Sequence, residues 1–162
     1  MTIVQKKGLG VIIILAPFIF TGHFLEESRG FVGWFNSHVS RGITSGLFWN
    51  VNITALVITV VVSITELLAP SAGSVTLIIL WFSFLMLANA LFHITGAIVD
   101  KLYMPGLITA IVLYLPYYFF VVSRLLKTGR IRIGWLIVLT FLGSALMIVH
   151  GFLVIFRGSR LF

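Results

Sequence analysis

The sequence predicts an all-α fold, an integral membrane bundle of about five transmembrane helices. The first observation is composition: 60% of the 162 residues are hydrophobic and 9% are charged, with a mean hydropathy of +1.17. These values lie outside the range of ordinary soluble domains. The second is a set of five apolar runs, each close to the roughly 20 residues that a helix needs to cross a bilayer. Helices are expected because backbone amides in lipid must be bonded internally, and because the runs lack the alternation of barrel strands.

The expected spans cover roughly residues 8–27, 47–68, 75–98, 106–126 and 133–156. They leave little chain for a soluble part, so we expect residues 1–162 to form a single transmembrane helical domain. The first span is expected to stay in the protein, because no small-x-small cleavage site follows it. The segment 28–46 mixes glycine, aromatic and basic residues, which is typical of an interfacial segment that caps a site.

The net charge of +7 arises from basic residues that flank the spans. We therefore expect membrane lipids with anionic headgroups as partners, and no nucleic acid. The chain has no cysteine, which excludes disulfides, iron–sulfur clusters and thiolate zinc sites. The dense basic loop 124–132 favours a multi-pass protein of the cell inner membrane with its N-terminus in the cytoplasm. The basic residues expected on that side are Lys6, Lys7, Arg124, Lys127, Arg130 and Arg132, against Arg29, Arg41, Lys101, Arg157 and Arg160 on the other.

The most unusual polar pattern is the motif His23-Phe-Leu-Glu-Glu27 at the end of the first span. Positions i, i+3 and i+4 share one face of a helix, so the imidazole and both carboxylates can converge. Ionisable groups inside a membrane are costly and usually have a function.

The span order also predicts the depth of the other polar residues, because odd spans end, and even spans begin, on the same side. At about 1.5 Å per residue, His23 lies ~24 Å above Lys7 and His93 lies ~27 Å above Val75, which are similar depths. We therefore expect a buried polar pocket at one membrane face, with only Glu66 clearly at the other. The residues expected at the pocket's face besides the motif are Asn50, Asn52, Asn89, His93, Asp100, Tyr103 and His150.

A set of imidazoles and carboxylates from two helices is typical of a divalent metal site for zinc, iron or manganese. The motif is also similar to the H-x-x-E-H zinc-protease pattern, although its last position here is Glu. The metal hypothesis makes His23, Glu27 and His93 the ligands and Glu26 the general base that activates a metal-bound water. Tyr103 is expected to donate to a substrate oxygen. The residues expected to bind substrate are Asn50, Asn89 and His150.

Other interpretations of the same residues stay open. Glu26 and Glu27 could act without metal as a coupled acid–base pair, which suits isomerisation or cyclisation of a lipid-soluble substrate. Two of the three histidines His23, His93 and His150 could ligate haem iron in an electron-transfer protein. The carboxylates could also relay protons in a small transporter, although the gathering of polar residues on one side argues against this. The simplest alternative is a solvated headgroup cluster paired with Arg29.

Three signals occur in order: the motif His23-Phe-Leu-Glu-Glu27, the later His93, and Tyr103-Met-Pro-Gly106. Together they resemble the HXXEE family of small bacterial membrane proteins over roughly residues 10–120. The resemblance implies a multi-helix membrane protein that is suspected of being an enzyme, without a named activity. The residues that it implies are His23, Glu26, Glu27, His93, Tyr103, Pro105 and Gly106.

We accordingly expect an integral membrane enzyme that acts on a hydrophobic or amphiphilic small molecule at one membrane face. Its centre would be the His/Glu cluster, used either as a metal-dependent hydrolase-like site or as a metal-free acid–base site.

Overall fold

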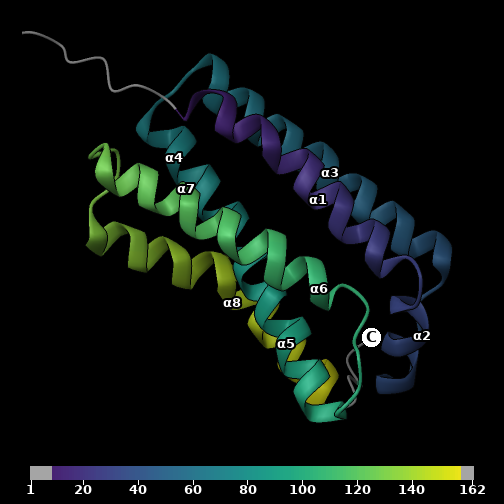
Figure 1. Ribbon diagram of the computed structural model, residues 1–162. Coiled ribbons are helices and arrows are strands. Elements are labelled where there is room, and N and C mark those ends of the chain that lie inside the picture. Colours follow the sequence, from purple (N-terminus) through teal and green to yellow (C-terminus); the bar gives the residue numbers. More distant parts are fainter. Residues whose placement is uncertain (1–8, 158–162) are drawn as a thin grey trace, which may run out of the picture.

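The computed structural model describes residues 9–157, and every regular element in this range is helical (Figure 1). The elements include two π-helical segments, η2 and η3, and one 3-10 helix, η1. In chain order they are η1 (Gly10–Ile14), α1 (Leu15–Glu27), α2 (Phe31–His38), α3 (Ser45–Leu68), α4 (Ala72–Phe82), η2 (Ser83–Ala88), α5 (Asn89–Asp100), α6 (Leu107–Thr109), η3 (Ala110–Tyr114), α7 (Leu115–Lys127) and α8 (Ile133–Arg157).

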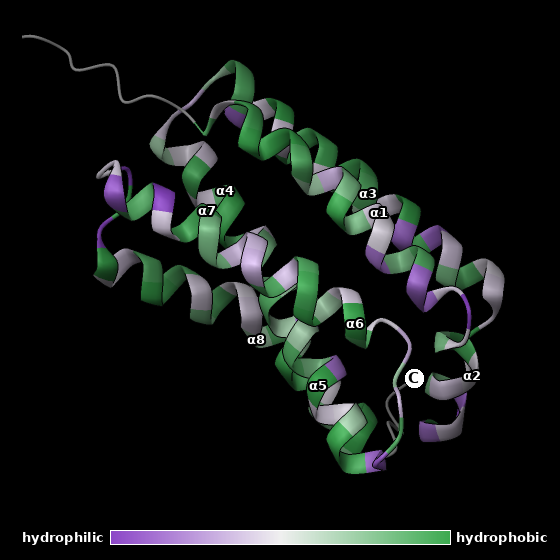
Figure 2. Ribbon diagram, viewed as in Figure 1, coloured by the Kyte–Doolittle hydropathy of each residue, from purple (hydrophilic) through white to green (hydrophobic). Residues whose placement is uncertain are grey.

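Five continuous helical stretches of the described chain are long and apolar enough to cross a membrane, which makes this a multi-pass membrane protein. The predicted all-α class is confirmed, and each described span end lies within three residues of its predicted position. Figure 2 shows the apolar bodies of the helices, with hydrophilic residues gathered towards the two ends of the bundle. Lys6, Lys7 and Arg160, which enter the charge count for orientation, lie outside the described residues. The spans are Gly10–Glu27, Ser45–Leu68, Ala72–Asp100, Leu107–Lys127 and Ile133–Arg157.

The helices pack around one main apolar core. α1 runs beside α3, while α8 packs along α4 and η2 (Figure 1). Lipid tails are as apolar as leucine, so close packing between helices must supply much of the cohesion. At Gly143 of α8 the approach is so close that a Cβ atom would lie 2.4 Å from the backbone oxygen of Leu80. Side chains fully buried in this core include Ile13, Ile78, Phe82, Met86, Tyr114 and Leu125.

Helix α2 lies at one end of the bundle and is tied to the last residue of α5. Nε1 of Trp34 donates a hydrogen bond to Oδ2 of Asp100 at 2.6 Å, and Nε2 of His38 lies 3.0 Å from Oδ1 of the same carboxylate. The two rings also stack, with centroids 4.2 Å apart. These contacts hold the segment that was predicted to cap a site in place over the bundle end.

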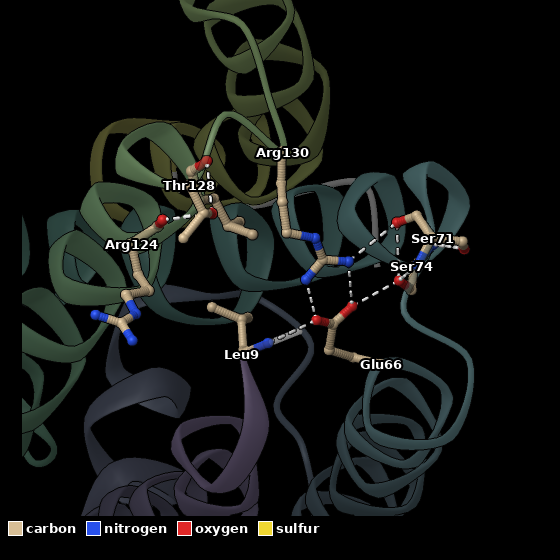
Figure 3. A network of polar contacts seen from close by, with 8 residues as sticks. Leu9, Glu66, Ser71, Ser74, Arg124, Thr128 and Arg130 are labelled. Carbon is tan, nitrogen blue, oxygen red and sulfur yellow. Dashed lines mark hydrogen bonds and ion pairs between the residues drawn. The ribbon is translucent and has the colours of Figure 1, made fainter. Parts of the chain in front are cut away.

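A second polar network fixes the opposite end of the bundle (Figure 3). The carboxylate of Glu66 pairs with both terminal nitrogens of the Arg130 guanidinium and is 1% exposed. The same carboxylate accepts hydrogen bonds from the Ser74 hydroxyl at 2.6 Å and from the backbone N–H of Leu9 at 2.9 Å. Both oxygens are therefore fully used, and the network joins η1, α3, α4 and the loop before α8.

Candidate functional site

Three buried side chains from α1 and α5 converge on one point. Nε2 of His93 lies 3.0 Å from Oε1 of Glu27, and Nε2 of His23 lies 3.5 Å from the same oxygen. The exposed fractions are 1% for His23, 5% for Glu27 and 0% for His93. The ligand-type atoms of the three residues lie within 4.8 Å of one another, close enough to hold one metal ion. We call this set the His–Glu–His cluster.

The ring of His23 is oriented by Thr109 at the start of the fourth span. Nδ1 of His23 lies 2.9 Å from Oγ1 of Thr109, and that hydroxyl donates in turn to the backbone oxygen of Gly106 at 3.3 Å. Since the hydroxyl proton is used there, Nδ1 of His23 carries the hydrogen and Nε2 presents a lone pair in the neutral ring. Nε2 of His23 has no hydrogen-bond partner, although it faces a carboxylate oxygen. Because the lone pair and the carboxylate oxygen repel each other, a cation between them, either a proton or a metal ion, stabilises this arrangement.

Glycine at position 106 is what allows the fourth span to approach the cluster. Gly106 has a φ of +97°, a conformation that L side chains rarely adopt. A Cβ atom there would also lie 2.6 Å from Cε1 of His93 and 2.9 Å from Cγ of Glu27. Pro105 lies against Gly30 in the same way, since a Cβ on Gly30 would be 3.0 Å from the proline ring. The Tyr103–Gly106 segment therefore packs closely against the cluster and against Gly30.

Glu26 has a different environment from its neighbour Glu27. Its Oε2 accepts a hydrogen bond from the N–H of Thr109 at 2.8 Å, and its Oε1 accepts from the N–H groups of Ile108 at 3.1 Å and Gly106 at 3.2 Å. The hydroxyl of Tyr103 donates to the same Oε1. A carboxylate at the N-terminus of a helix satisfies amides that have no partner within the helix and interacts well with its dipole. Glu26 thus joins the first span to the fourth.

Tyr103 lies outside the membrane-spanning segments and is 54% exposed. Partial burial and the hydrogen bond that it donates to Glu26 raise the pKa of the Tyr103 hydroxyl to about 12. The hydroxyl therefore stays protonated over the physiological range and acts as a donor to Glu26.

A cavity of about 260 Å³ opens beside the cluster and is bounded by α1, α2, α3, η2, α5 and α8. His23 and Glu27 form part of its wall, together with Asn52, Asn89 and His150. Oδ1 of Asn89 is buried and has no hydrogen-bond partner. The rest of the wall is apolar and rich in phenylalanine, namely Phe20, Phe31, Phe35, Phe48, Phe84, Phe92, Ile43, Leu47, Val51, Ala55, Leu85 and Met147.

The structure brings most of the predicted site residues together, but two lie elsewhere. Asn89 and His150 line the cavity. Asn50 is exposed and does not line the cavity; it lines an adjoining shallow groove that shares Val51 and Ala55 with the cavity. Two residues along a helix correspond to about 200° of rotation around its axis, so Asn52 lines the cavity and Asn50 does not. Tyr103 lies in an outer groove beside α5 and α6 and does not line the cavity.

Two residues near the cluster were not singled out from the sequence. Thr109 contacts both His23 and Glu26, yet a lone threonine near a helix start gives no distinct sequence signal. Tyr114 lies in an aromatic-rich stretch of the same span. Its ring centroid lies 4.1 Å from that of His23, and its buried hydroxyl has no hydrogen-bond partner. The two residues lie three and eight positions beyond Gly106, so their place on the helix that follows the Tyr103–Gly106 segment is the one sequence signal they carry.

Fold and site together define a multi-pass membrane protein with a buried His–Glu–His cluster at one end of an all-α bundle. The chain belongs to the HXXEE family: the family model, described as a protein of unknown function with HXXEE motif, matches residues 14–121. That range contains the motif, His93 and the Tyr103–Gly106 segment, so the resemblance read from these residues is confirmed. No curated protein and no solved structure matched the chain.

Proposed function

We propose that this protein is an integral membrane enzyme that acts on a hydrophobic or amphiphilic substrate, with a divalent metal held by His23, Glu27 and His93. The observation that carries the proposal is the convergence of these three buried side chains at the wall of a mostly apolar cavity. A carboxylate taken out of water is stable only when a cation or several donors compensate it. One metal ion on two imidazoles and one carboxylate meets this need and leaves coordination positions for water or substrate.

The surrounding contacts support such a centre. Thr109 holds the far nitrogen of the His23 ring, which is the usual arrangement behind a metal-ligating histidine. The bound metal would supply Lewis-acid chemistry, either on a carbonyl oxygen or on a bound water. Zinc, iron and manganese all accept this donor set.

The role proposed for Glu26 changes from that of the sequence hypothesis. It accepts hydrogen bonds from the Tyr103 hydroxyl and from backbone N–H groups at the start of the fourth span, and it does not line the cavity. These contacts favour a positioning residue over a general base. Tyr103 is likewise proposed to position Glu26 and not to touch substrate.

We also propose that the cluster lies at the outer face of the cell inner membrane, with the N-terminus in the cytoplasm. The dense basic loop 124–132 lies at the opposite end of the bundle, beside the Glu66 network, where cytoplasmic headgroups would surround it (Figure 3). Substrate would then reach the cavity from the outer leaflet.

Metal analysis of the purified protein tests the proposal. After loading with zinc, iron or manganese and removal of free metal, we expect about one ion per chain in the wild type. His93→Ala and Glu27→Gln should each lower the bound metal at least tenfold. The matched control is His38→Ala, because His38 is a histidine at the same end of the bundle that contacts Asp100 and not the cluster. Wild type that binds no metal would contradict the metal centre.

A second candidate is metal-free acid–base chemistry, which one observation favours. Nε2 of His93 lies 3.0 Å from Oε1 of Glu27, the geometry of a histidine–carboxylate hydrogen bond that can hold and deliver a proton. Absence of bound metal in the wild type, combined with turnover that Glu27→Gln abolishes, would select this version.

The haem and transporter alternatives receive less support. The ring centroids of His23 and His93 lie 5.0 Å apart and both Nε2 atoms face one carboxylate oxygen, so a porphyrin plane has no room between them. A proton path to the other face would have to pass the apolar core around Ile13 and Phe82. At that face the oxygens of Glu66 are already committed to Arg130, Ser74 and Leu9.

A further inference from the structure

The cavity beside the cluster has an apolar floor on the side of the membrane centre. On three spans the polar residue of the wall is followed, towards the membrane centre, by an apolar one: Ala55 lies deeper than Asn52 on α3, Phe84 deeper than Asn89 on the third span, and Met147 deeper than His150 on α8. A ligand whose polar group lies at these residues therefore places its apolar part towards the membrane centre.

The α3 side of the cavity wall is exposed at the surface of the bundle. The cavity residues Leu47 and Val51 of α3 are 49% and 58% exposed. Both are apolar and belong to a membrane span, so their exposed surface faces lipid. A ligand can therefore reach the cavity from the membrane beside α3.

The charges around the cavity limit the polar group of the ligand. Glu27 is the only acidic residue in the cavity wall, and no lysine or arginine of the described chain lines it. Without a bound metal, a phosphate headgroup would meet the carboxylate of Glu27 and no basic side chain, and a quaternary ammonium has no hydrogen to donate to a buried acceptor in the wall. The cavity volume of about 260 Å³ is also near the lower end of small-molecule sites, too small for two acyl chains.

The unpartnered oxygen of Asn89 identifies a group that the ligand should carry. Oδ1 of Asn89 is a buried acceptor in the cavity wall without a hydrogen-bond donor. Leaving such an acceptor unpaired is unfavourable, so a ligand with an O–H group gains from binding there. The oxygen of the same hydroxyl can accept a hydrogen bond from the neighbouring cluster or coordinate a metal ion there. A hydrocarbon or a simple ester has no hydrogen to donate to Asn89.

We infer that the cavity binds an uncharged single-chain lipid with a hydroxyl group at its polar end, which enters sideways from the membrane beside α3. The hydroxyl lies between Asn89 and the His–Glu–His cluster, and the chain lies along Ala55, Phe84 and Met147. The inference rests on the proposed function for its use as a substrate site, and it names the class of substrate. Binding itself does not require the metal.

Photo-crosslinking in lipid nanodiscs tests this inference. The probe is a twelve-carbon alcohol with a diazirine in the chain and a terminal alkyne, and the matched probes are the carboxylic acid and the trimethylammonium compound of the same chain. Labelled peptides are identified by mass spectrometry, with metal-loaded protein and with chelator-treated protein. In the chelator-treated protein we expect the alcohol to label the cavity segments of α3, η2 and α8 at least fivefold more than either charged probe, and unlabelled alcohol to compete.

Two asparagines of α3 supply a matched pair of variants. Asn52→Phe places a ring in the cavity and should reduce cavity labelling at least fivefold, whereas Asn50→Phe places the same ring on the outer groove and should leave it unchanged. Asn89→Leu keeps the branched shape of the side chain, removes the acceptor oxygen and should lower the preference for the alcohol over the acid. Helix content and thermal unfolding of each variant show whether it folds, and Asn89→Leu keeps the test decisive if Asn52→Phe does not.

Several outcomes would overturn the inference: equal labelling by the acid probe, equal effects of Asn50→Phe and Asn52→Phe, or labels spread over lipid-facing residues such as Phe141 and Phe152. Selective labelling of chelator-treated protein together with no metal in the loaded protein would support the cavity and contradict the proposed metal centre. One bound metal with no selective labelling would do the reverse.

Discussion

Glu26 and Glu27 are neighbours in the chain, yet their carboxylates serve different partners. Glu27 lies between two buried imidazoles, 3.0 Å from His93 and 3.5 Å from His23. Glu26 accepts hydrogen bonds from three backbone amides at the start of the fourth span. The Glu27 carboxylate therefore belongs to the cluster. The Glu26 carboxylate binds the start of the fourth span, and this span places Thr109 beside the cluster. Of the two glutamates of the motif, Glu27 is the cluster residue and Glu26 holds the fourth span in position.

Gly106→Ala should disturb the cluster. The substitution places a Cβ at a φ of +97° and 2.6 Å from Cε1 of His93, so we expect a loss of at least about 2 kcal/mol in unfolding free energy. Bound metal should fall in parallel. The matched control is Gly33→Ala in α2, where a Cβ meets nothing within 4 Å and which should be neutral or slightly stabilising. Thermal unfolding in detergent compares the two, and equal behaviour would contradict the close packing described for Gly106.

Thr109→Val should weaken metal binding without removing a ligand. The variant keeps the backbone N–H that donates to Glu26 but removes the hydroxyl that holds Nδ1 of His23. We expect a 10- to 100-fold lower affinity, the usual cost of losing such an orienting partner. Thr109→Ser retains the hydroxyl and should bind as the wild type does. Competition with a chromophoric chelator measures both, and a Ser variant as weak as the Val variant would assign the effect to packing instead of orientation.

Arg130→Met should destabilise the far end of the bundle. The substitution leaves the carboxylate of Glu66 buried without its guanidinium, which costs about 3–5 kcal/mol for a buried pair. Arg124→Met changes an exposed arginine close in sequence and should stay within about 0.5 kcal/mol (Figure 3). The double variant Glu66→Leu, Arg130→Met should recover part of the loss, because it removes the unpaired charge. Metal binding at the other end should not change, which separates the two polar networks.

Tyr103→Phe should change the stability of the protein most near neutral pH. The raised pKa of Tyr103, about 12 against 10 for a free tyrosine, means that the folded state favours the protonated hydroxyl. This stabilisation is complete below pH 10 and is lost as the pH rises from 10 towards 12. The difference in Tm between wild type and Tyr103→Phe should therefore shrink over that range. Because the side chain is 54% exposed, the difference below pH 10 should be only about 0.5–1 kcal/mol.

An equal Tm difference at pH 8 and pH 11.5 would show that the Tyr103 hydroxyl does not donate to Glu26. Tyr118→Phe is unsuitable as a control, because its hydroxyl contacts Ser83 and Thr140 inside the bundle. The ring of Tyr103 lies in an outer groove, so its substitution by Phe leaves the apolar packing intact.

The depth of each polar residue could be predicted from the sequence, but its direction around the helix could not. Counting spans placed His23 and His93 at similar heights, and their rings indeed lie 5.0 Å apart. The same counting gave Asn50 and Asn52 similar heights and could not say which faces the cavity. Membrane helices are apolar on nearly every face, so the hydrophobic periodicity that orients a helix in a soluble protein is weak here.

The hydrogen bonds made by backbone groups could not be predicted from the sequence either. Glu26 was assigned as a general base because a carboxylate beside a metal motif suggests one, whereas its partners are amides at the start of another span. Backbone N–H groups have no sequence signature, since every residue but proline has one. Gly106 was the accessible clue: a glycine directly before a helix indicates either a special φ or a close approach, and here it provides both.

The π-helical segment η2 sets the angular position of His93. It ends directly before Asn89 at the start of α5, which carries His93. A π-turn behaves as a single-residue insertion in an α-helix, and one residue corresponds to about 100° of rotation. Deleting one residue from Ser83–Ala88 would restore regular winding and turn His93 away from Glu27, without altering the packing of α4. One extra residue in η2 thus sets the rotation of α5 about its axis, and this rotation determines whether His93 contacts Glu27 of the first span.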